Sequence, residues 1–153
     1  EPEMIKIEND KDCIPQGEEV IISCLKSNSH PKDGVMIYKI AYRDKSLVYA
    51  TDTEGFVGAN KKLVLFARDT DLLIHDSQYT SEEYLNACFS KQGYGHSTFD
   101  MALETFSQAK AKSLAFFHFD PNYSDEFLLE IENHYTENCK SCFVPKEGQE
   151  IVL

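Results

Sequence analysis

Two histidines and an aspartate flank apolar runs of the sequence, in positions where their side chains could hold a metal ion. His30 precedes such a run, whereas Asp52 and His118 each end one. Neutral imidazole and carboxylate groups are ligands of zinc and similar metals, and loops at the ends of adjacent strands deliver them. A carboxylate can also bridge two cations that together activate water for phosphoester hydrolysis. We therefore predict a hydrolytic metal site formed by His30, Asp52 and His118.

Each of these residues has a simpler interpretation when it is taken singly. A histidine after an apolar strand is usually a polar loop residue, and an aspartate before a threonine usually caps a turn. Three such residues at three strand ends favour the metal site over three separate coincidences.

His96 and Asp76 form a second candidate group. His96 precedes an expected helix N-terminus, where the helix dipole disfavours the protonated ring. It could orient or protonate a leaving group if a carboxylate supported it, and Asp76, after the apolar run 72–74, is the natural partner. The alternative is that both residues brace loops. His75 should point to the other side of its strand, and we expect it and His134 to be structural or solvent-exposed.

The first half of the chain is expected to form antiparallel strands of one sheet. Alternating or continuous apolar patterns predict them, and the polar segment 43–46 between two of them is typical of a hairpin. The expected strands are 4–8, 20–25, 35–42 and 47–51.

The second half alternates short apolar runs with helical patterns, which is typical of strand–helix–strand units. A capping box at Thr80 predicts a helix through about Ala87, Ser97 or Thr98 can cap the next helix, and Ser124 can cap another. Strands are expected at 72–74, 114–117 and 149–153, and a loose loop at 55–62. The fold class is therefore α/β, with one mixed sheet flanked by helices.

The charge of the chain argues against long nucleic acid as a ligand. The formal net charge is -11, and the fifteen Lys and Arg residues are scattered, with no cluster longer than Lys61-Lys62. A protein that grips a phosphate backbone shows a basic stripe. Because no run of eighteen apolar residues and no signal peptide occurs, we expect a cytoplasmic protein without a membrane partner. The 153 residues suffice for one domain, 1–153.

The cysteines do not predict a disulfide framework, because they are odd in number and irregularly spaced. Only Cys139 and Cys142 have a spacing that suits a zinc ribbon or a redox pair. No second pair supports either site, so we expect ordinary thiols and keep the metal or redox site as the alternative. The cysteines are Cys13, Cys24, Cys88, Cys139 and Cys142.

An ordered set of motifs resembles the metallo-β-lactamase superfamily, and within it the ribonuclease Z and phosphodiesterase branch. The resemblance extends from about Ile21 to the end of the chain. The motifs are His30 followed by Gly34 and Tyr38-Lys39-Ile40; Val48-Tyr49-Ala50-Thr51-Asp52-Thr53; Leu72-Leu73-Ile74-His75-Asp76; Gly95-His96-Ser97-Thr98; and Phe117-His118.

The resemblance implies specific roles for the candidate residues. His30 would be the family's third metal motif, Asp52 its bridging aspartate and His118 its last histidine ligand. His96 matches the family's His-Ser-Thr element, and Asp76 stands where ribonuclease Z has a glutamate. The family's His-x-His-x-Asp-His signature does not occur in this sequence. The chain thus resembles the C-terminal half of the αββα sandwich, and because it also begins without Met, we expect it to be a fragment of a longer protein.

Three functional consequences of this resemblance are expected. The complete protein would be a metal-dependent hydrolase, a phosphodiesterase that acts on a small phosphodiester through metal-bound hydroxide, with two divalent ions (zinc, or manganese or iron). This chain alone would carry a partial or empty site and be inactive. Its apolar inner sheet face would be covered by the missing N-terminal half or by a homodimer partner.

Two alternatives to this function stay open. The chain could be a non-catalytic scaffold of hydrolase ancestry for association or ligand binding, or it could belong to a lactonase or thioesterase of the same superfamily. A lactonase or thioesterase would keep the metal site and change the substrate.

Overall fold

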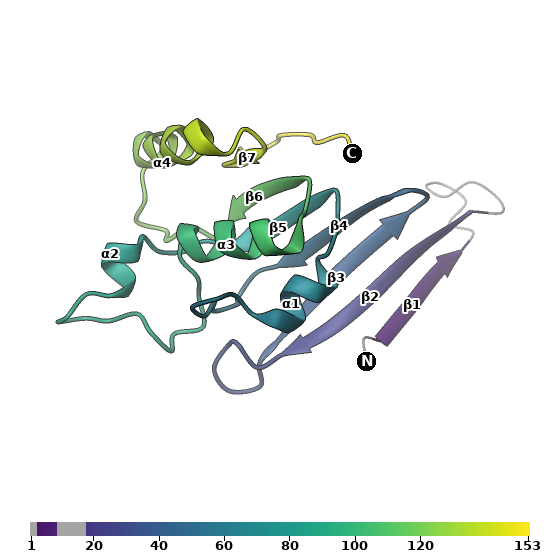
Figure 1. Ribbon diagram of the computed structural model, residues 1–153, viewed down its shortest axis with the longest axis horizontal. Coiled ribbons are helices and arrows are strands. Elements are labelled where there is room, and N and C mark those ends of the chain that lie inside the picture. Colours follow the sequence, from purple (N-terminus) through teal and green to yellow (C-terminus); the bar gives the residue numbers. More distant parts are fainter. Residues whose placement is uncertain (1–2, 9–17) are drawn as a thin grey trace.

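The computed structural model describes residues 3–8 and 18–153 of the chain, and Cys13 lies outside these ranges. The strands of the described part form one sheet whose spatial order follows the sequence (Figure 1). They are β1 (Glu3–Glu8), β2 (Glu19–Ser27), β3 (Val35–Tyr42), β4 (Lys45–Ala50), β5 (Leu72–Asp76), β6 (Ser113–Phe117) and β7 (Cys142–Phe143).

The sheet is mixed. Strands β1 to β4 pair antiparallel, and β4 to β7 pair parallel. Residues 43–44 form the turn of the β3–β4 hairpin, in which Arg43 has a φ of 53°. The predicted α/β class, with antiparallel strands in the first half and strand–helix units in the second, is therefore confirmed.

Four helices connect the strands of the described part, and side-chain caps open each of them. They are α1 (Lys61–Phe66), α2 (Ser81–Tyr84), α3 (Phe99–Ala109) and α4 (Asp125–Asn138). The predicted caps are confirmed: Thr80 forms the capping box of α2, Thr98 caps α3 and Ser124 caps α4. Each of these side chains accepts a hydrogen bond from a first-turn amide that would otherwise lack a partner.

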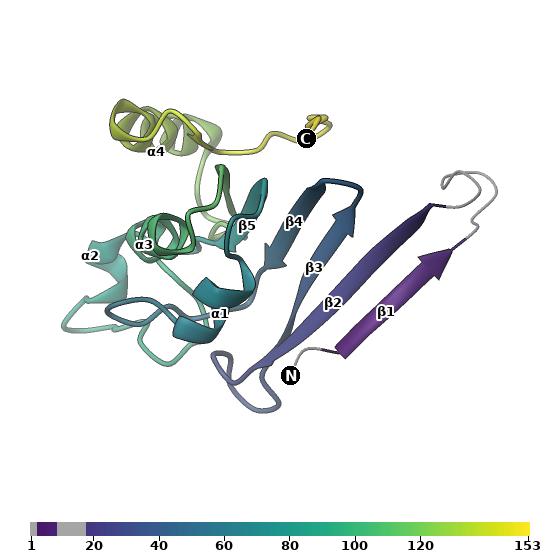
Figure 2. The ribbon, with the colours of Figure 1, turned by 45° about the vertical axis from the view of Figure 1, so that its right-hand side comes forward.

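The hydrophobic core lies between one face of the sheet and the helices, as Figure 2 shows for α1 and α3. On this same face, the ring of Tyr135 in α4 stacks on Phe99 and lies tilted against Phe116. Buried side chains of the sheet and the helices meet there, including Ile37, Val48, Leu63, Val64, Leu73, Phe99, Ala102, Leu114 and Phe116.

The opposite face of the sheet exposes large apolar side chains. Tyr38 pairs with Tyr49 across β3 and β4, and the Tyr49 ring contacts Phe117, with 6.1 Å between centroids. Tyr38, Tyr49, Phe117 and Met36 are each 37–40% exposed. We call these four residues the open face.

Three predicted segments differ from the structure. Residues 149–153 are exposed and form no strand, and the strand beside β6 is instead Cys142–Phe143. Helix α2 ends at Tyr84 and not near Ala87. Helix α1 begins at Lys61, within the predicted loop 55–62. Asn60 caps it, and Leu63 and Val64 anchor it in the core. None of the helices in the described part is long and apolar enough to cross a membrane.

The expectation of ordinary thiols at Cys139 and Cys142 is wrong, because these residues form a disulfide. Cys139 caps the C-terminus of α4 and Cys142 opens β7, and the turn between them holds the two Cα atoms 5.5 Å apart. This separation lies within the range that disulfides require. Cys88 is an exposed free thiol.

Candidate metal centre

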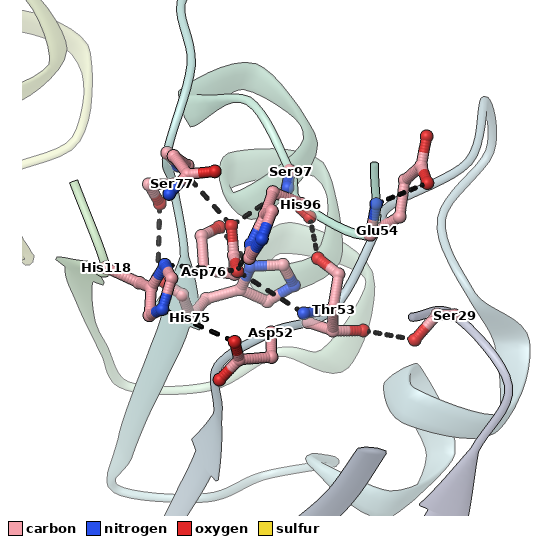
Figure 3. Close-up of polar contacts among 12 residues, drawn as sticks. Ser29, Asp52, Thr53, Glu54, His75, Asp76, Ser77, His96, Ser97 and His118 are labelled. Atoms are coloured by element: carbon pink, nitrogen blue, oxygen red, sulfur yellow. Dashed lines mark hydrogen bonds and ion pairs between the residues drawn. The ribbon is translucent and has the colours of Figure 1, made fainter. Parts of the chain in front are cut away.

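The carboxyl ends of β2, β4, β5 and β6 lie at one edge of the sheet, and the predicted site residues follow these ends. His30 follows β2, Asp52 follows β4, Asp76 ends β5 and His118 follows β6. His96 comes from the loop before α3. Figure 3 shows the side chains of Asp52, Asp76, His96 and His118 pointing toward one another. In the sequence, the only sign of this convergence is that these residues lie near the ends of expected strands and helices.

Asp52 and His118 both hold left-handed backbone conformations, with φ of 51° and 62°. Such conformations cost free energy for residues other than glycine and persist where the surroundings fix them, often at functional sites. The strain falls on the two residues whose side chains approach each other: Nε2 of His118 lies 3.4 Å from Oδ1 of Asp52.

The candidate ligands form two overlapping groups, within each of which one donor atom per residue lies within 4.8 Å of the others. The first group is His30, Asp52 and His96, and the second is Asp76, His96 and His118. His96 belongs to both: its ring stacks on His118, with 4.9 Å between centroids, and contacts the edge of His30 at 5.5 Å. The structure thus gathers the predicted trio around His96, although neither group contains all three of its members.

Asp76 is fully buried and holds His96 through a hydrogen bond of 2.8 Å between Oδ2 and Nδ1. Burial of the His96 ring by itself lowers its pKa. The hydrogen bond and charge of Asp76, together with the charges of Asp52 and Glu54, outweigh this effect and raise the pKa above its usual value. The arrangement favours a proton on Nδ1 and leaves Nε2 for a ligand, a substrate or a metal.

The donor set fits a divalent metal ion. Nδ1 of His118 is buried and has no hydrogen-bond partner among the described residues, and Oδ2 of Asp76 lies 3.8 Å away from it. An unsatisfied buried nitrogen beside carboxylates calls for an explanation, and a bound cation supplies one. Imidazoles with a bridging-type carboxylate suit zinc or manganese.

A buried hydroxyl network joins the segments that carry the candidate ligands. Oγ of Ser29 lies 2.7 Å from Oγ of Ser27 and 2.6 Å from Oγ1 of Thr53. Oγ of Ser97 donates to the carbonyl of Thr53 at 2.5 Å and accepts from the amide of Gly55 at 2.9 Å. These bonds tie the residues next to His30, Asp52 and His96 to one another, as Figure 3 shows.

The Asp76 carboxylate also takes part in this network. It accepts from the amides of Ser97 at 2.9 Å and Thr53 at 3.3 Å. Asp76 therefore fixes the backbone on both sides of the site as well as the ring of His96.

Gly95 allows the His96 loop to reach His30. Its φ is 94°, and a Cβ atom at this position would lie 2.5 Å from Cδ2 of His30 and 2.5 Å from Cδ of Pro31. Both the backbone conformation and the contact exclude a side chain.

The sequence analysis missed the residues whose hydrogen bonds hold the candidate ligands in place, among them Ser29, Thr53 and Glu54. Small or acidic side chains in an acidic chain do not stand out. The position of segment 51–54 after a strand was a signal for Thr53 and Glu54, and no pattern in the sequence indicated Ser29. His75 is buried, as expected of a structural residue, and His134 is exposed.

Comparison with known proteins gives relatives in sequence and in structure, although no protein-family model matches the chain. Ribonuclease Z of Pyrococcus furiosus is 35% identical over 112 residues, which cover 72% of this chain and 32% of that protein. Ribonuclease Z of Bacillus subtilis is 31% identical over 90 residues, 59% of this chain and 27% of that protein. The chain therefore spans about a third of the length of these relatives.

Solved structures share the fold at low sequence identity. The metallo-β-lactamase fold protein YhfI of Bacillus subtilis matches 85% of this chain and 48% of its own, with a TM-score of 0.66 and 18% identity. The short form of human tRNase Z matches 92% of this chain and 44% of its own, with a TM-score of 0.62 and 15% identity. Zinc-bound PqqB of Methylobacterium extorquens matches 90% of this chain and 51% of its own, with a TM-score of 0.62 and 13% identity.

In each case nearly all of this chain matches about half of the neighbour, which confirms the prediction of half an αββα sandwich. The motifs, the sheet and the sequence relatives agree on one assignment. The chain belongs to the metallo-β-lactamase superfamily, and its sequence relatives are those of the ribonuclease Z branch.

Proposed function

We propose that this chain carries part of the metal centre of a phosphodiester hydrolase. The observation that carries the proposal is the convergence of His30, Asp52 and His118 on the ring of His96, with the buried Nδ1 of His118 unsatisfied. A pair of divalent ions in such a centre lowers the pKa of water and neutralises charge on phosphoryl oxygens. His30, Asp52 and His118 would hold the ions, and zinc is the metal named for the bound form of the PqqB neighbour.

His96 would donate a proton to the leaving oxygen. Its Nδ1 is engaged by Asp76, and the raised pKa keeps the ring protonated nearer to neutral pH. A histidine whose pKa lies near the working pH is an effective general acid. Asp76, buried and bound to three backbone amides, would orient the ring and stabilise its charge.

The substrate that best fits the charge of the chain is a small phosphodiester. The relatives named ribonuclease Z and tRNase Z act on RNA by name, but this chain has a net charge of -11 and no basic stripe. Electrostatic attraction to a long polyanion needs such a stripe. A short diester held by the metal centre does not.

The open face would be covered by a second half of the sandwich. It presents Tyr38, Tyr49, Phe117 and Met36 on the side of the sheet opposite the described helices (Figure 2). About half of each structural neighbour lies beyond the match with this chain. An N-terminal half with the His-x-His-x-Asp-His signature would both bury this face and supply the remaining ligands. A homodimer would bury the face without supplying that signature.

The test uses the longest polypeptide that the gene encodes, loaded with zinc or manganese, beside the 153-residue chain. Both are assayed side by side with a chromogenic phosphodiester and a chromogenic lactone. We expect the longer polypeptide to hydrolyse the diester, Asp52→Asn to abolish this activity, and the short chain to be inactive. Faster lactone hydrolysis would identify a lactonase of the same superfamily. Activity that Asp52→Asn leaves unchanged would contradict the assignment of the site.

A further inference from the structure

Glu54 lies two residues after Asp52 and belongs to neither group of candidate ligands. We propose that Glu54 is a second positioning residue of the centre, beside Asp76: its carboxylate accepts hydrogen bonds from the amides of Gly93 and Gly95 and thereby sets His96 against His30 and Asp52. The inference rests on the proposed function, because it concerns how the proton donor of that site is held.

The contacts of Glu54 reach three segments besides its own. Oε1 accepts from the amide of Gly93 at 2.7 Å and from the hydroxyl of Tyr84 at 2.6 Å, and Oε2 accepts from the amide of Gly95 at 3.0 Å. The amide of Glu54 itself donates to the carbonyl of Ser29 at 3.0 Å. One residue thus links the segment before His30, the segment after Asp52, helix α2 and the loop before His96.

The burial of this carboxylate needs a reason. Glu54 is 8% exposed, and within residues 3–8 and 18–153 no Lys, Arg or His forms an ion pair with it. Moving a carboxylate out of water is costly unless hydrogen bonds compensate. Neutral donors meet this need here, and two of the three come from the loop that carries His96. The hydrogen bonds of the Glu54 carboxylate therefore fix the position of that loop.

The position of the loop decides where His96 lies. Gly95 is the residue directly before His96, and its backbone packs so closely on His30 that a Cβ would clash. If the bond from the Gly95 amide to Glu54 is lost, the loop is free to move away from His30. The Nδ1 proton of His96 would then be exposed to exchange, although Asp76 itself is untouched.

The test uses metal-free protein and a spectroscopic signal of His96. A proton shared between Nδ1 of His96 and Asp76 gives a downfield proton resonance, which is assigned by its loss in His96→Gln. In Glu54→Gln, which keeps the shape but offers one acceptor oxygen instead of two, we expect the exchange of this proton with water to be at least about ten-fold faster, as for the loss of a charge-assisted hydrogen bond. Glu130→Gln, an exposed substitution on α4 with the same change in charge, should leave the rate unchanged.

A second variant keeps the proposal testable if Glu54→Gln does not fold. Tyr84→Phe removes one donor to Oε1 and leaves both glycine amides bound, so we expect an intermediate increase of about three-fold. Exchange within two-fold of the parent in every folded variant at these two positions would overturn the proposal. This measurement needs neither metal nor substrate, so a failure of the proposed phosphodiesterase activity cannot be mistaken for a failure of the positioning role.

If the longer polypeptide is active, the dependence of its hydrolysis rate on the leaving group is a second measurement. Misplacing a proton donor slows esters with poor leaving groups more than those with good ones. Glu54→Gln should therefore lower the rate for a phenyl ester more than for a nitrophenyl ester. Equal losses for both esters would indicate a purely structural role and contradict the proposal.

Discussion

Gly95 shows how single residues shape the site, because it combines a left-handed backbone with direct contact to His30. Gly93 is a matched control: its φ is 82°, but a Cβ there meets nothing within 4 Å. We expect Gly93→Ala to cost about 1–2 kcal/mol from backbone strain alone. Gly95→Ala should cost at least about 1 kcal/mol more, because the added Cβ displaces His30. Denaturant unfolding of the two variants checks this, and equal losses would contradict the contact.

His75 predicts a pH dependence of stability. Its ring is fully buried, and burial lowers its pKa, although the backbone of Asp76 opposes the shift. The folded chain therefore keeps His75 neutral where the unfolded chain takes up a proton below about pH 6.5. The stability that this residue contributes is present above that pH and is lost as the pH falls, with a slope of at most about 1.4 kcal/mol per pH unit.

The measurement is the free energy of unfolding of the metal-free chain between pH 7.5 and 5.5, compared with His75→Gln. His96 has the opposite sign, because its raised pKa contributes stability at low pH that is lost as the pH rises. The difference between parent and variant isolates His75 from that contribution. The two curves should converge toward acid pH, and parallel curves would show that His75 does not carry the effect.

At the scale of elements, the disulfide between Cys139 and Cys142 joins the end of α4 to β7. It closes a very short loop, so the chain-entropy account gives about 2 kcal/mol of stabilisation. We expect the double variant Cys139→Ser, Cys142→Ser to lose about this much in denaturant unfolding, and the parent to lose the same amount with a reducing agent. Cys88→Ser, at an exposed free thiol, should change nothing. A parent that is insensitive to reductant would contradict this.

The elements that the sequence predicted well are those specified locally. Thr80, Thr98 and Ser124 cap helices through bonds to amides three residues away, so the signal lies within one turn. Strand β7 was missed because two residues gain their strand character only by pairing with β6, about thirty residues earlier. Residues 149–153 have strand composition but pair with no strand in the described part of the chain.

The same contrast explains the site. His30, Asp52, His96 and His118 were predictable because their residue types and their places at strand ends indicate chemistry. Glu54 was not, because its acceptor role exists only when Tyr84, Gly93 and Gly95, some 30 to 41 residues later, fold back onto it. Supporting residues are specified by tertiary structure and leave no spacing pattern.

At the scale of the whole molecule, the open face sets the behaviour of the isolated chain. A contiguous exposed apolar patch above a few hundred Å² favours association. We expect the 153-residue chain to self-associate with increasing concentration in sedimentation experiments, and the double variant Tyr38→Lys, Tyr49→Lys to stay monomeric. Phe89→Lys, at an exposed loop residue away from this face, should not prevent association. A parent that remains monomeric throughout would contradict a role for the open face.

Metal binding by His30, Asp52 and His118 is the central claim, and a zinc titration tests it most directly. The measurement is a zinc titration of the longest polypeptide that the gene encodes, followed by calorimetry and repeated with His30→Ala, Asp52→Asn and His118→Ala, and with His134→Ala as the control. We predict that the parent binds zinc, that each of the three substitutions weakens binding at least about ten-fold, and that the control does not. No zinc binding by the parent, or binding that all four variants retain equally, would contradict the claim that this cluster is a metal centre.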